Sequence, residues 1–435
     1  MLFKRYLMCC VCSFAIMACG GSDDNSSEAT ATPTPKGPTP TASVATRRPT
    51  SVPNEPTPPT VVTSAPITAP TITPTPTPTN TPTKTATSTP TSLPMVSDMF
   101  GPRITYPTFV GNSDVALGDF NRDGSLDIVT AAAAGRIDIL LGHGDGTFVA
   151  GKPLTAARAN FFDSGYVNND AKLDLVVADY INGAINTYLG NGDGTFTLRD
   201  TADAPGTSQG IELAHFNGDT AIDAATVSPS TNQLVIFHGN GNGTFTHIQN
   251  LSTGPTPFNL KVGDFDEDND IDIIMGNSGD GTLSLFFNQG DGTFASATTL
   301  STRVHPEVAA IGDWNRDNHL DVAVVHQSTS SVSIYLGRGN GTFQLPIQLT
   351  TDSVPFGAVT LDSNLDGYLD LAVTTLSGFL NIFLGRGDGT FHPKISSSSP
   401  GSPRYLEAGN LNQDSRPDLA VAVYDAGSVD VYLAR

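Results

Sequence analysis

Oxygen-bearing side chains recur in this chain at a fixed spacing that suits the binding of a hard cation. One segment appears seven times, and its first copy reads GDFNRDGSLDIV from Gly118. Counted from Asp119, positions 1, 3, 5 and 9 of this segment are Asp or Asn. Carboxylate and amide oxygens at alternate positions of a tight loop, closed by a further carboxylate, suit calcium, which takes about 6–8 oxygen ligands. We therefore predict calcium sites in these loops.

Four loops carry the full ligand set, and a seventh-repeat loop carries a weaker one. With the modest affinity of extracellular modules, about 10⁻⁴ to 10⁻³ M, we expect about four to five bound ions. Position 6 is Gly or Asn in the four full loops, and these residues tolerate positive φ. The predicted ligands are Asp119, Asn121, Asp123 and Asp127; Asp264, Asp266, Asp268 and Asp272; Asp313, Asn315, Asp317 and Asp321; Asp362, Asn364, Asp366 and Asp370; and Asn410, Asn412, Asp414 and Asp418.

Two loops have lost the first ligand, which is Tyr166 in the second repeat and His215 in the third. We expect these two loops to be weak or metal-free and to be held by hydrogen bonds between side chains and backbone. A purely conformational explanation is open for every loop, because Asp, Asn and Gly also favour turns for backbone reasons. Clustered carboxylates repel each other unless a cation neutralises them, which favours the metal in the full loops.

The elements that position these loops follow from a second repeated motif. It occurs six times, as LGHGDGTF, LGNGDGTF, HGNGNGTF, FNQGDGTF, LGRGNGTF and LGRGDGTF. Asp-Gly and Asn-Gly between apolar runs predict hairpins whose two central residues have positive φ. In the first repeat we expect strands at residues 115–120, 127–130 and 137–141, with a fourth starting at 147–148. Four strands in each of seven repeats predict an all-β, seven-bladed β-propeller.

The two ends of the folded region indicate how the ring closes. The last repeat ends at Arg435 on its third strand. The Phe of each GTF motif recurs every 48–49 residues, and one more step back from Phe148 reaches Phe100. We therefore predict that the N-terminal strand of the domain completes the last blade, which removes an open sheet edge.

The first 97 residues have a different composition. A basic start at Lys4 and Arg5, a short apolar run and small residues before Cys19 predict a signal peptide over residues 1–18. The segment FAIMACGG resembles a bacterial lipoprotein lipobox, which implies lipidation of Cys19 and a membrane anchor. Plain secretion, with Cys19 in the discarded peptide, is the alternative. All four cysteines lie in this segment, so we expect no disulfide framework.

Residues 19–97 are rich in Thr and Pro, and we expect a disordered stalk. Of the 31 prolines, 17 lie between Glu28 and Pro94, and too few apolar side chains are present to offset the entropy of ordering. The predicted domains are thus the signal peptide at 1–18, the stalk at 19–97 and the propeller at 98–435. The formal net charge of −21 disfavours nucleic acid as a partner, because the two repel each other.

The paired motifs resemble FG-GAP and VCBS repeats, which build integrin α-chain propellers and occur in many bacterial surface proteins. The resemblance covers roughly residues 100–435. It implies that the Asp-rich loops join the first and second strands of each blade on one face. The GDGTF turns share that face, and ligands of such propellers usually meet the opposite face.

We therefore expect a calcium-binding, non-enzymatic binding, adhesion or display module, extracellular or periplasmic, with a protein or glycan ligand. A propeller enzyme of the lyase or hydrolase type is one alternative, but no G-x-S-x-G or H-E-x-x-H motif occurs. A structural component of an envelope assembly is another alternative. Candidate contact residues in the opposite-face loops are Tyr180, Asn182, Phe258, His305, His326, Phe356 and Tyr405.

Overall fold

The computed structural model describes residues 95–156 and 159–435, which belong to a compact unit spanning Ala86–Arg435. The predicted signal peptide, Cys19 and nearly all of the predicted stalk lie outside the described residues. The described part opens with a short helix, α2 (Val96–Met99). Within this part of the chain, no helix combines the length and the apolar character needed to cross a bilayer.

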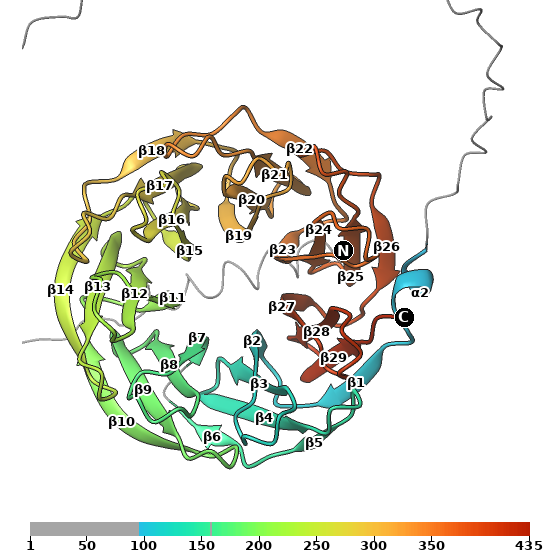
Figure 1. Cartoon of the computed structure of the whole chain (residues 1–435), viewed down its shortest axis with the longest axis horizontal. Coiled ribbons are helices and arrows are strands. Elements are labelled where there is room, and N and C mark those ends of the chain that lie inside the picture. The colour runs from blue at the N-terminus through green and yellow to red at the C-terminus, as the bar shows by residue number, and fades with distance from the viewer. Residues whose placement is uncertain (1–94, 157–158) are drawn as a thin grey trace, which may run out of the picture. The chain divides into compact units, whose positions relative to one another are not determined.

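The compact unit is a ring of seven antiparallel sheets around a central axis, as Figure 1 shows in the view down that axis. Each blade has four strands running from the axis to the rim, and blade 1 carries one additional short strand. Blade 1 comprises β2 (Asn112–Gly118), β3 (Asp127–Ala132), β4 (Arg136–Gly142), β5 (Phe148–Ala150) and β6 (Leu154–Thr155). Blade 2 comprises β7 (Ala159–Gly165), β8 (Asp174–Asp179), β9 (Ala184–Gly190) and β10 (Phe196–Asp203).

The next four blades repeat the same order of strands. Blade 3 comprises β11 (Gln209–Ala214), β12 (Asp223–Ser228), β13 (Gln233–Gly239) and β14 (Phe245–Ser252). Blade 4 comprises β15 (Pro257–Gly263), β16 (Asp272–Asn277), β17 (Thr282–Phe286) and β18 (Thr298–Ser301). Blade 5 comprises β19 (Pro306–Gly312), β20 (Asp321–His326), β21 (Ser331–Tyr335) and β22 (Ile347–Thr350). Blade 6 comprises β23 (Pro355–Leu361), β24 (Asp370–Thr375), β25 (Phe379–Phe383) and β26 (Ile395–Ser398).

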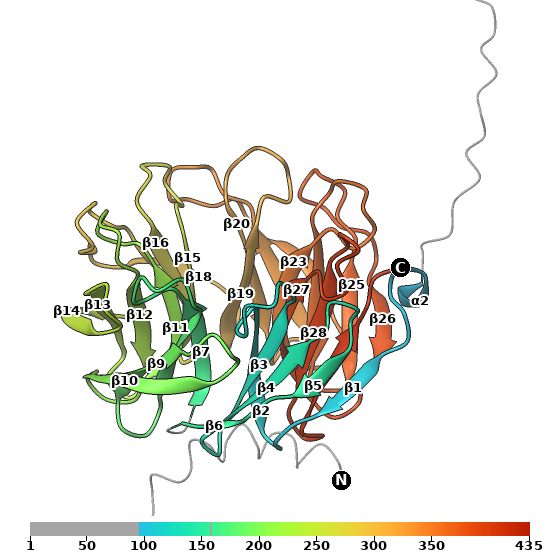
Figure 2. The ribbon, with the colours of Figure 1, turned by 60° about the horizontal axis from the view of Figure 1, so that its bottom comes forward.

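The last blade joins the two ends of the folded region. Blade 7 comprises β27 (Pro403–Gly409), β28 (Asp418–Val423), β29 (Ser428–Tyr432) and, as its outer strand, β1 (Ile104–Pro107). Phe100 forms an isolated bridge with Ala434, as the GTF residue Phe391 does with Gly385 in blade 6. Phe100 is 1% exposed and packs with Tyr432. The predicted seven-bladed fold and its closure by an N-terminal strand are confirmed, and Figure 2 shows β1 beside the last blade.

The strand limits differ from the prediction at the first loop. The inner strand β2 starts at Asn112 and ends at Gly118, whereas residues 119 and 120 belong to the loop. The reason is that the Phe120 N–H donates to the Asp127 carboxylate at 2.9 Å instead of to a strand partner. The chain therefore leaves the sheet two residues earlier than the apolar pattern indicates.

The hydrophobic core lies between neighbouring blades. The second strand of every blade is buried along its whole length, as in β3 and β20. Aromatic pairs join one blade to the next: Phe120 of the first loop meets Phe196 of blade 2 with ring centroids 5.7 Å apart, and Trp314 meets Phe391 at 6.2 Å. The apolar residues of both repeated motifs thus act as contacts between blades, which holds the Asp-rich loops in a fixed ring.

Candidate metal centre

The Asp-rich loops and the glycine-rich turns lie at the same end of the blades. Each Asp-rich loop joins the first and second strands, and each GDG-type turn joins the third and fourth, as between β2 and β3 and between β4 and β5. In an antiparallel blade these two connections fall at one end. We call this end the loop face, and we call the other end of the blades the opposite face.

The Asp at position 9 of each loop is fully buried and holds the backbone together. One oxygen of Asp127 accepts the N–H groups of Phe120 and Asn121, at 2.9 and 3.2 Å, and the other accepts the N–H of Gly142 at 2.8 Å. Because each carboxylate clamps its loop to the third strand, we call these residues the clasp aspartates. They are Asp127, Asp174, Asp223, Asp272, Asp321, Asp370 and Asp418, each with the same pair of backbone contacts.

The clasp explains why an Asp persists at position 9 of the second and third loops, where the first ligand is lost. Burial raises the pKa of Asp127 to about 6 and that of Asp272 to about 7, although the backbone N–H groups partly oppose this shift. Four clasp aspartates were predicted as metal ligands in full loops, and their role toward a metal stays a prediction. Their structural role was missed, although their presence in all seven repeats was a usable signal.

Positions 1, 3 and 5 form a closed hydrogen-bond network in the first, fifth, sixth and seventh loops, which carry Asp or Asn at position 1 and Asn at position 3. In the first loop, Asp119 and Asn121 accept the N–H of Asp123 at 3.0 and 2.9 Å. The Asn121 amide donates to Asp123 at 2.9 Å, so one carboxylate oxygen already has a proton donor. The same contacts recur in the fifth, sixth and seventh loops.

The fourth loop, residues 264–272, differs because all three of these positions are aspartates. Carboxylate oxygens of Asp264, Asp266 and Asp268 lie within 4.8 Å of one another. One oxygen of Asp264 and one of Asp266 are buried without a hydrogen-bond partner among the described residues. Burial and the neighbouring charges of Asp268 and Asp264 raise the pKa of Asp266. Unpartnered carboxylate oxygens that converge on one point fit a calcium ion, which would neutralise them.

The second and third loops satisfy their acidic groups from within the chain. In the second loop the Lys172 ammonium lies 3.1 Å from the Asp170 carboxylate. In the third loop, His215 contacts the Ala221 carbonyl at 2.9 Å, and the Asn217 amide donates to Asp219 at 3.0 Å. Of these three contacts, only the one between His215 and the Ala221 carbonyl is of the predicted side-chain-to-backbone kind, and weak or absent metal binding by these loops stays a prediction.

Position 4 of the loops has a role that the sequence did not reveal. This residue adopts positive φ in all seven loops, although only one of the seven is Gly. Four position-4 residues contact the next blade: the Asn169 amide donates to the Gly241 carbonyl at 3.0 Å, Glu267 pairs with His319, the Arg316 guanidinium lies 5.5 Å from the Tyr368 ring centroid, and the Gln413 amide donates to the Gly124 carbonyl at 3.3 Å. The seven residues are Arg122, Asn169, Gly218, Glu267, Arg316, Leu365 and Gln413.

The turns of the second motif differ from the predicted hairpin geometry. In the first repeat Gly144 and Gly146 have positive φ of 73° and 81°, whereas Asp145 between them does not. Asp145 instead accepts the N–H and hydroxyl of Thr147, at 2.9 and 2.6 Å. The Gly146 N–H donates to the Leu411 carbonyl of the adjacent blade at 3.1 Å. The prediction of two central residues with positive φ was wrong. The positive φ values belong to the glycines on either side of Asp145, and Gly146 also contacts the Asp-rich loop of the adjacent blade.

Several residues predicted to be ligand contacts on the opposite face pack inside the ring: Phe356 and His326 are buried, whereas Phe258 and Tyr405 are partly exposed. Phe258 and Tyr405 both meet Phe161, with ring centroids 5.8 and 5.4 Å apart, and Tyr405 also meets Phe356 at 5.2 Å. These aromatic side chains come from four inner strands and pack together near the axis. His326 is fully buried and contacts the Ser333 hydroxyl at 2.8 Å, so it is a core residue. Of the predicted contacts, Asn182 and His305 are exposed.

A charged network joins the inner strands close to these aromatic residues. The Lys261 ammonium lies 2.5 Å from the Glu212 carboxylate. Burial lowers the pKa of Lys261, but the charge and hydrogen bond of Glu212, together with the charges of Glu407 and Asp163, outweigh burial, and the net pKa is raised. Burial raises the pKa values of Asp163 and Glu407 to about 7 and that of Asp114 to about 8. The axis is therefore polar and acidic, with one lysine inside it.

Comparison with known proteins agrees with this architecture. The model of the FG-GAP-like repeat matches residues 215–275, 264–324, 313–373 and 362–421. A crystal structure of BBS1N in complex with ARL6DN, soaked with mercury, has a TM-score of 0.57 at 14% identity, covering 78% of this chain and 97% of that one. The same complex soaked with lead gives 0.58 at 15% identity, with coverage of 77% and 96%.

A protein from Lactobacillus plantarum has a similar fold, with a TM-score of 0.52 at 14% identity, covering 68% of this chain and 86% of that one. No curated protein sequence matches the chain. At these identities the solved structures show likeness of fold alone.

The fold and the Asp-rich loops define the chain as a seven-bladed β-propeller whose loop face gathers carboxylate and amide oxygens. Four of its repeats, within blades 3 to 7, are FG-GAP-like repeats.

Proposed function

We propose that this propeller is a calcium-stabilised, non-enzymatic binding or display module of the cell envelope. The fourth loop supports the calcium proposal most directly, because Asp264 and Asp266 each leave a buried carboxylate oxygen without a partner. With Asp268 and Asp272 they would hold the ion. Bound calcium would supply positive charge that stabilises three neighbouring carboxylates. The first, fifth, sixth and seventh loops carry the other predicted ligand sets.

The binding role is supported by the arrangement of the two faces. The loop face is formed by acidic loops that contact one another between blades. The opposite face is therefore the surface that we expect to meet a ligand. The lipid anchor at Cys19 and the extracellular or periplasmic location are proposals from the sequence alone. They are tested separately, by labelling the full chain with a radioactive fatty acid in cells and comparing Cys19→Ala, which loses the label if the proposal is correct.

The calcium proposal is tested with the full chain by thermal melting after chelation and again with millimolar calcium. Elemental analysis of protein dialysed to equilibrium against millimolar calcium, with the buffer value subtracted, then counts the bound metal. We expect calcium to raise the melting temperature strongly and about four to five ions to bind, as the number of ligand sets predicts. An unchanged melting temperature together with no bound metal would refute the calcium proposal and leave the loops as turns.

A further inference from the structure

The opposite face carries a guanidinium group that is fixed between two aromatic rings. Arg404 is the second residue of the inner strand β27. Its guanidinium lies 3.6 Å from the centroid of the Tyr424 ring and 5.2 Å from that of Phe356. Arg404 is partly exposed, as is Tyr424, whereas Phe356 is only 4% exposed. Stacking on two rings holds the plane of the guanidinium and leaves its N–H edges as donors.

The backbone of Arg404 is equally well fixed. Its carbonyl accepts the Thr374 hydroxyl, and the same Thr374 hydroxyl oxygen accepts the N–H of Gly357 at 3.1 Å. A Cβ at Gly357 would come within 2.6 Å of the Arg404 carbonyl oxygen, so blades 6 and 7 touch closely at this point. The guanidinium is therefore preorganised, which lowers the entropic cost of binding a ligand.

Arg404, like Arg416, is a partly buried cation without an ion-pair partner among the described residues, whereas the other partly buried arginine and lysine residues are paired. Arg136, Lys172, Lys261 and Lys394 each lie 2.5–3.1 Å from a carboxylate oxygen. No carboxylate of the described residues forms an ion pair with Arg404, and its buried Nε has no acceptor there. In a chain with 43 acidic and 22 basic residues, an arginine held in place without a carboxylate is complementary to an acidic group from outside.

An apolar surface continues from Arg404 toward the rim. The Tyr424 carbonyl accepts the N–H of Gly111 at 2.9 Å, which places the ring beside the loop between β1 and β2. In this loop Val110 is 60% exposed and Phe109 is 41% exposed. We call Arg404, Tyr424, Val110 and Phe109 together the seam strip, because they run from the last blade to the first, whereas the buried Phe356 of blade 6 only supports the Arg404 guanidinium.

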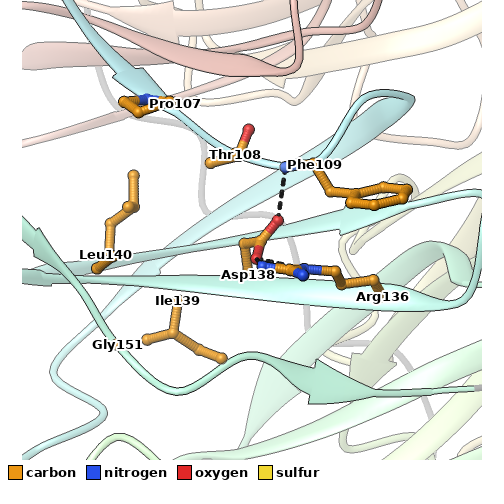
Figure 3. Close-up of a pocket in the computed structure, with 9 residues that line it drawn as sticks. Pro107, Thr108, Phe109, Arg136, Asp138, Ile139, Leu140 and Gly151 are labelled. Atoms are coloured by element: carbon orange, nitrogen blue, oxygen red, sulfur yellow. Dashed lines mark hydrogen bonds and ion pairs between the residues drawn. The ribbon is translucent and has the colours of Figure 1, made fainter.

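The seam strip ends at a cavity of about 190 Å³ (Figure 3). Figure 3 shows Phe109 above Asp138 and Arg136, with the Phe109 N–H bonded to Asp138 at 2.7 Å. The Arg136 charge is already compensated by the Asp138 carboxylate. Apolar groups of Pro107, Phe109 and Ala150 also line the cavity, so part of its wall is apolar. A cavity of about 150 Å³ can hold a benzene ring, so this one has room for an apolar side chain.

We propose that the seam strip binds an extended segment of a partner protein that carries a carboxylate next to apolar side chains. The carboxylate pairs with Arg404, and the apolar side chains cover Val110 and Phe109 and enter the cavity. This proposal rests on the proposed role as a binding module and names the class of ligand. The exposed valine and phenylalanine favour a polypeptide over a sugar acid, since they offer apolar contact beside the charge.

The test uses the full chain and a fluorescein-labelled peptide of alternating valine and glutamate, with binding measured by fluorescence anisotropy at low and moderate salt. We expect saturable binding that Arg404→Gln weakens about tenfold or more, because a charge-assisted hydrogen bond is lost. Val110→Ser, which changes an exposed side chain and leaves the fold intact, is expected to weaken binding about threefold. A second peptide carries glutamine in place of glutamate. We expect its affinity for the wild type to be as low as the affinity of the acidic peptide for Arg404→Gln.

The matched control is Arg303→Gln, which removes an equal charge from an exposed loop of the same face. It should leave peptide binding unchanged. The proposal is wrong if Arg404→Gln binds as tightly as the wild type, or if Arg303→Gln weakens binding equally, which would indicate bulk electrostatics. Binding of an oligogalacturonate but not of the peptide would also refute it, while leaving the chain a binding module. The calcium melt of the same samples tests the metal proposal independently.

Discussion

The fourth and second loops occupy equivalent positions in blades 4 and 2, yet the negative charge of their aspartates is compensated in only one of them. The fourth loop gathers Asp264, Asp266 and Asp268, and none of the three forms an ion pair with a cation of the described residues. The second loop has lost the first acidic position and places Lys172 on Asp170. Both loops have the same backbone path and the same clasp aspartate at position 9. The comparison indicates that the loop fold and the need for a metal are set by different residues.

The strongest test of this separation removes the clasp from both loops. Asp272→Ala leaves the buried N–H groups of Phe265 and Asn288 without acceptors, and Asp174→Ala does the same to Val167 and Gly190. We expect each change to lower the free energy of unfolding by about 3 kcal/mol, in chelator as well as in calcium, from unpaired buried donors. Urea unfolding monitored by circular dichroism measures both. A cost for Asp272→Ala that appears only with calcium would show that position 9 acts mainly as a ligand.

A smaller change converts the fourth loop toward the pattern of the first. Asp266→Asn removes one of three neighbouring charges and supplies an amide donor like that of Asn121. In chelator we expect the free energy of unfolding to rise by about 1 kcal/mol, while the stabilisation by calcium decreases. The matched reverse change, Asn121→Asp in the first loop, should have the opposite sign on both measurements. Equal responses of the two variants to calcium would contradict the charge argument.

The second loop can be changed in the other direction. Lys172→Gln removes the internal cation, and because both partners are about one-third exposed we expect a cost of only about 0.5 kcal/mol. Adding Tyr166→Asp restores the first ligand and should let the loop bind one more calcium ion. Elemental analysis of the double variant against the wild type tests this directly. An unchanged metal count would mean that position 1 and a free carboxylate are insufficient.

The smallest expected effect is a difference in titration. Burial and the charges of Asp268 and Asp264 raise the pKa of Asp266 above its usual value. Burial also acts on Asp170, but hydrogen bonds from the Lys172 backbone and ammonium outweigh it and lower the pKa. In chelator, Asp266 should therefore reduce stability as the pH rises through its folded pKa. Asp170 should add stability that is lost as the pH falls through its own folded pKa.

Carboxyl ¹³C NMR of the chelated chain can follow both residues. Calcium should lower the apparent pKa of Asp266 and leave that of Asp170 unchanged. Identical titration of the two carboxylates in chelator would remove the electrostatic difference on which the comparison rests.

The blade count and the closure could be predicted because they depend on periodicity. The regular spacing of Phe148 and its six equivalents requires only counting, and the step back to Phe100 identified the closing strand. The role of Asp272 could not be separated in the same way. The carboxylate oxygens that accept backbone N–H groups are also the kind of atoms that a calcium ion would need, so one residue type at one spacing is compatible with both roles.

Other features depend on contacts between blades that the repeat pattern does not contain. Arg404 and Tyr424 are distant in sequence, and Phe356 belongs to the preceding blade, so their stacking is set by packing alone. The positive φ at Glu267 and Arg316 could not be predicted from the sequence, because Glu and Arg rarely adopt positive φ. The predicted opposite-face contact Phe356 is buried instead, because aromatic side chains of the inner strands pack against one another near the axis.

The closing strand also decides where mechanical tension enters the ring. β1 is the outermost strand of the last blade and pairs with β29 through four residue pairs. Ahead of it, Val96, Met99 and Phe100 pack into the hydrophobic cluster shared by blades 6 and 7. A pull transmitted from the preceding residues must first extract these three side chains and can then peel β1 from β29 pair by pair. Under load, the propeller is therefore only as strong as the anchorage of its first few residues.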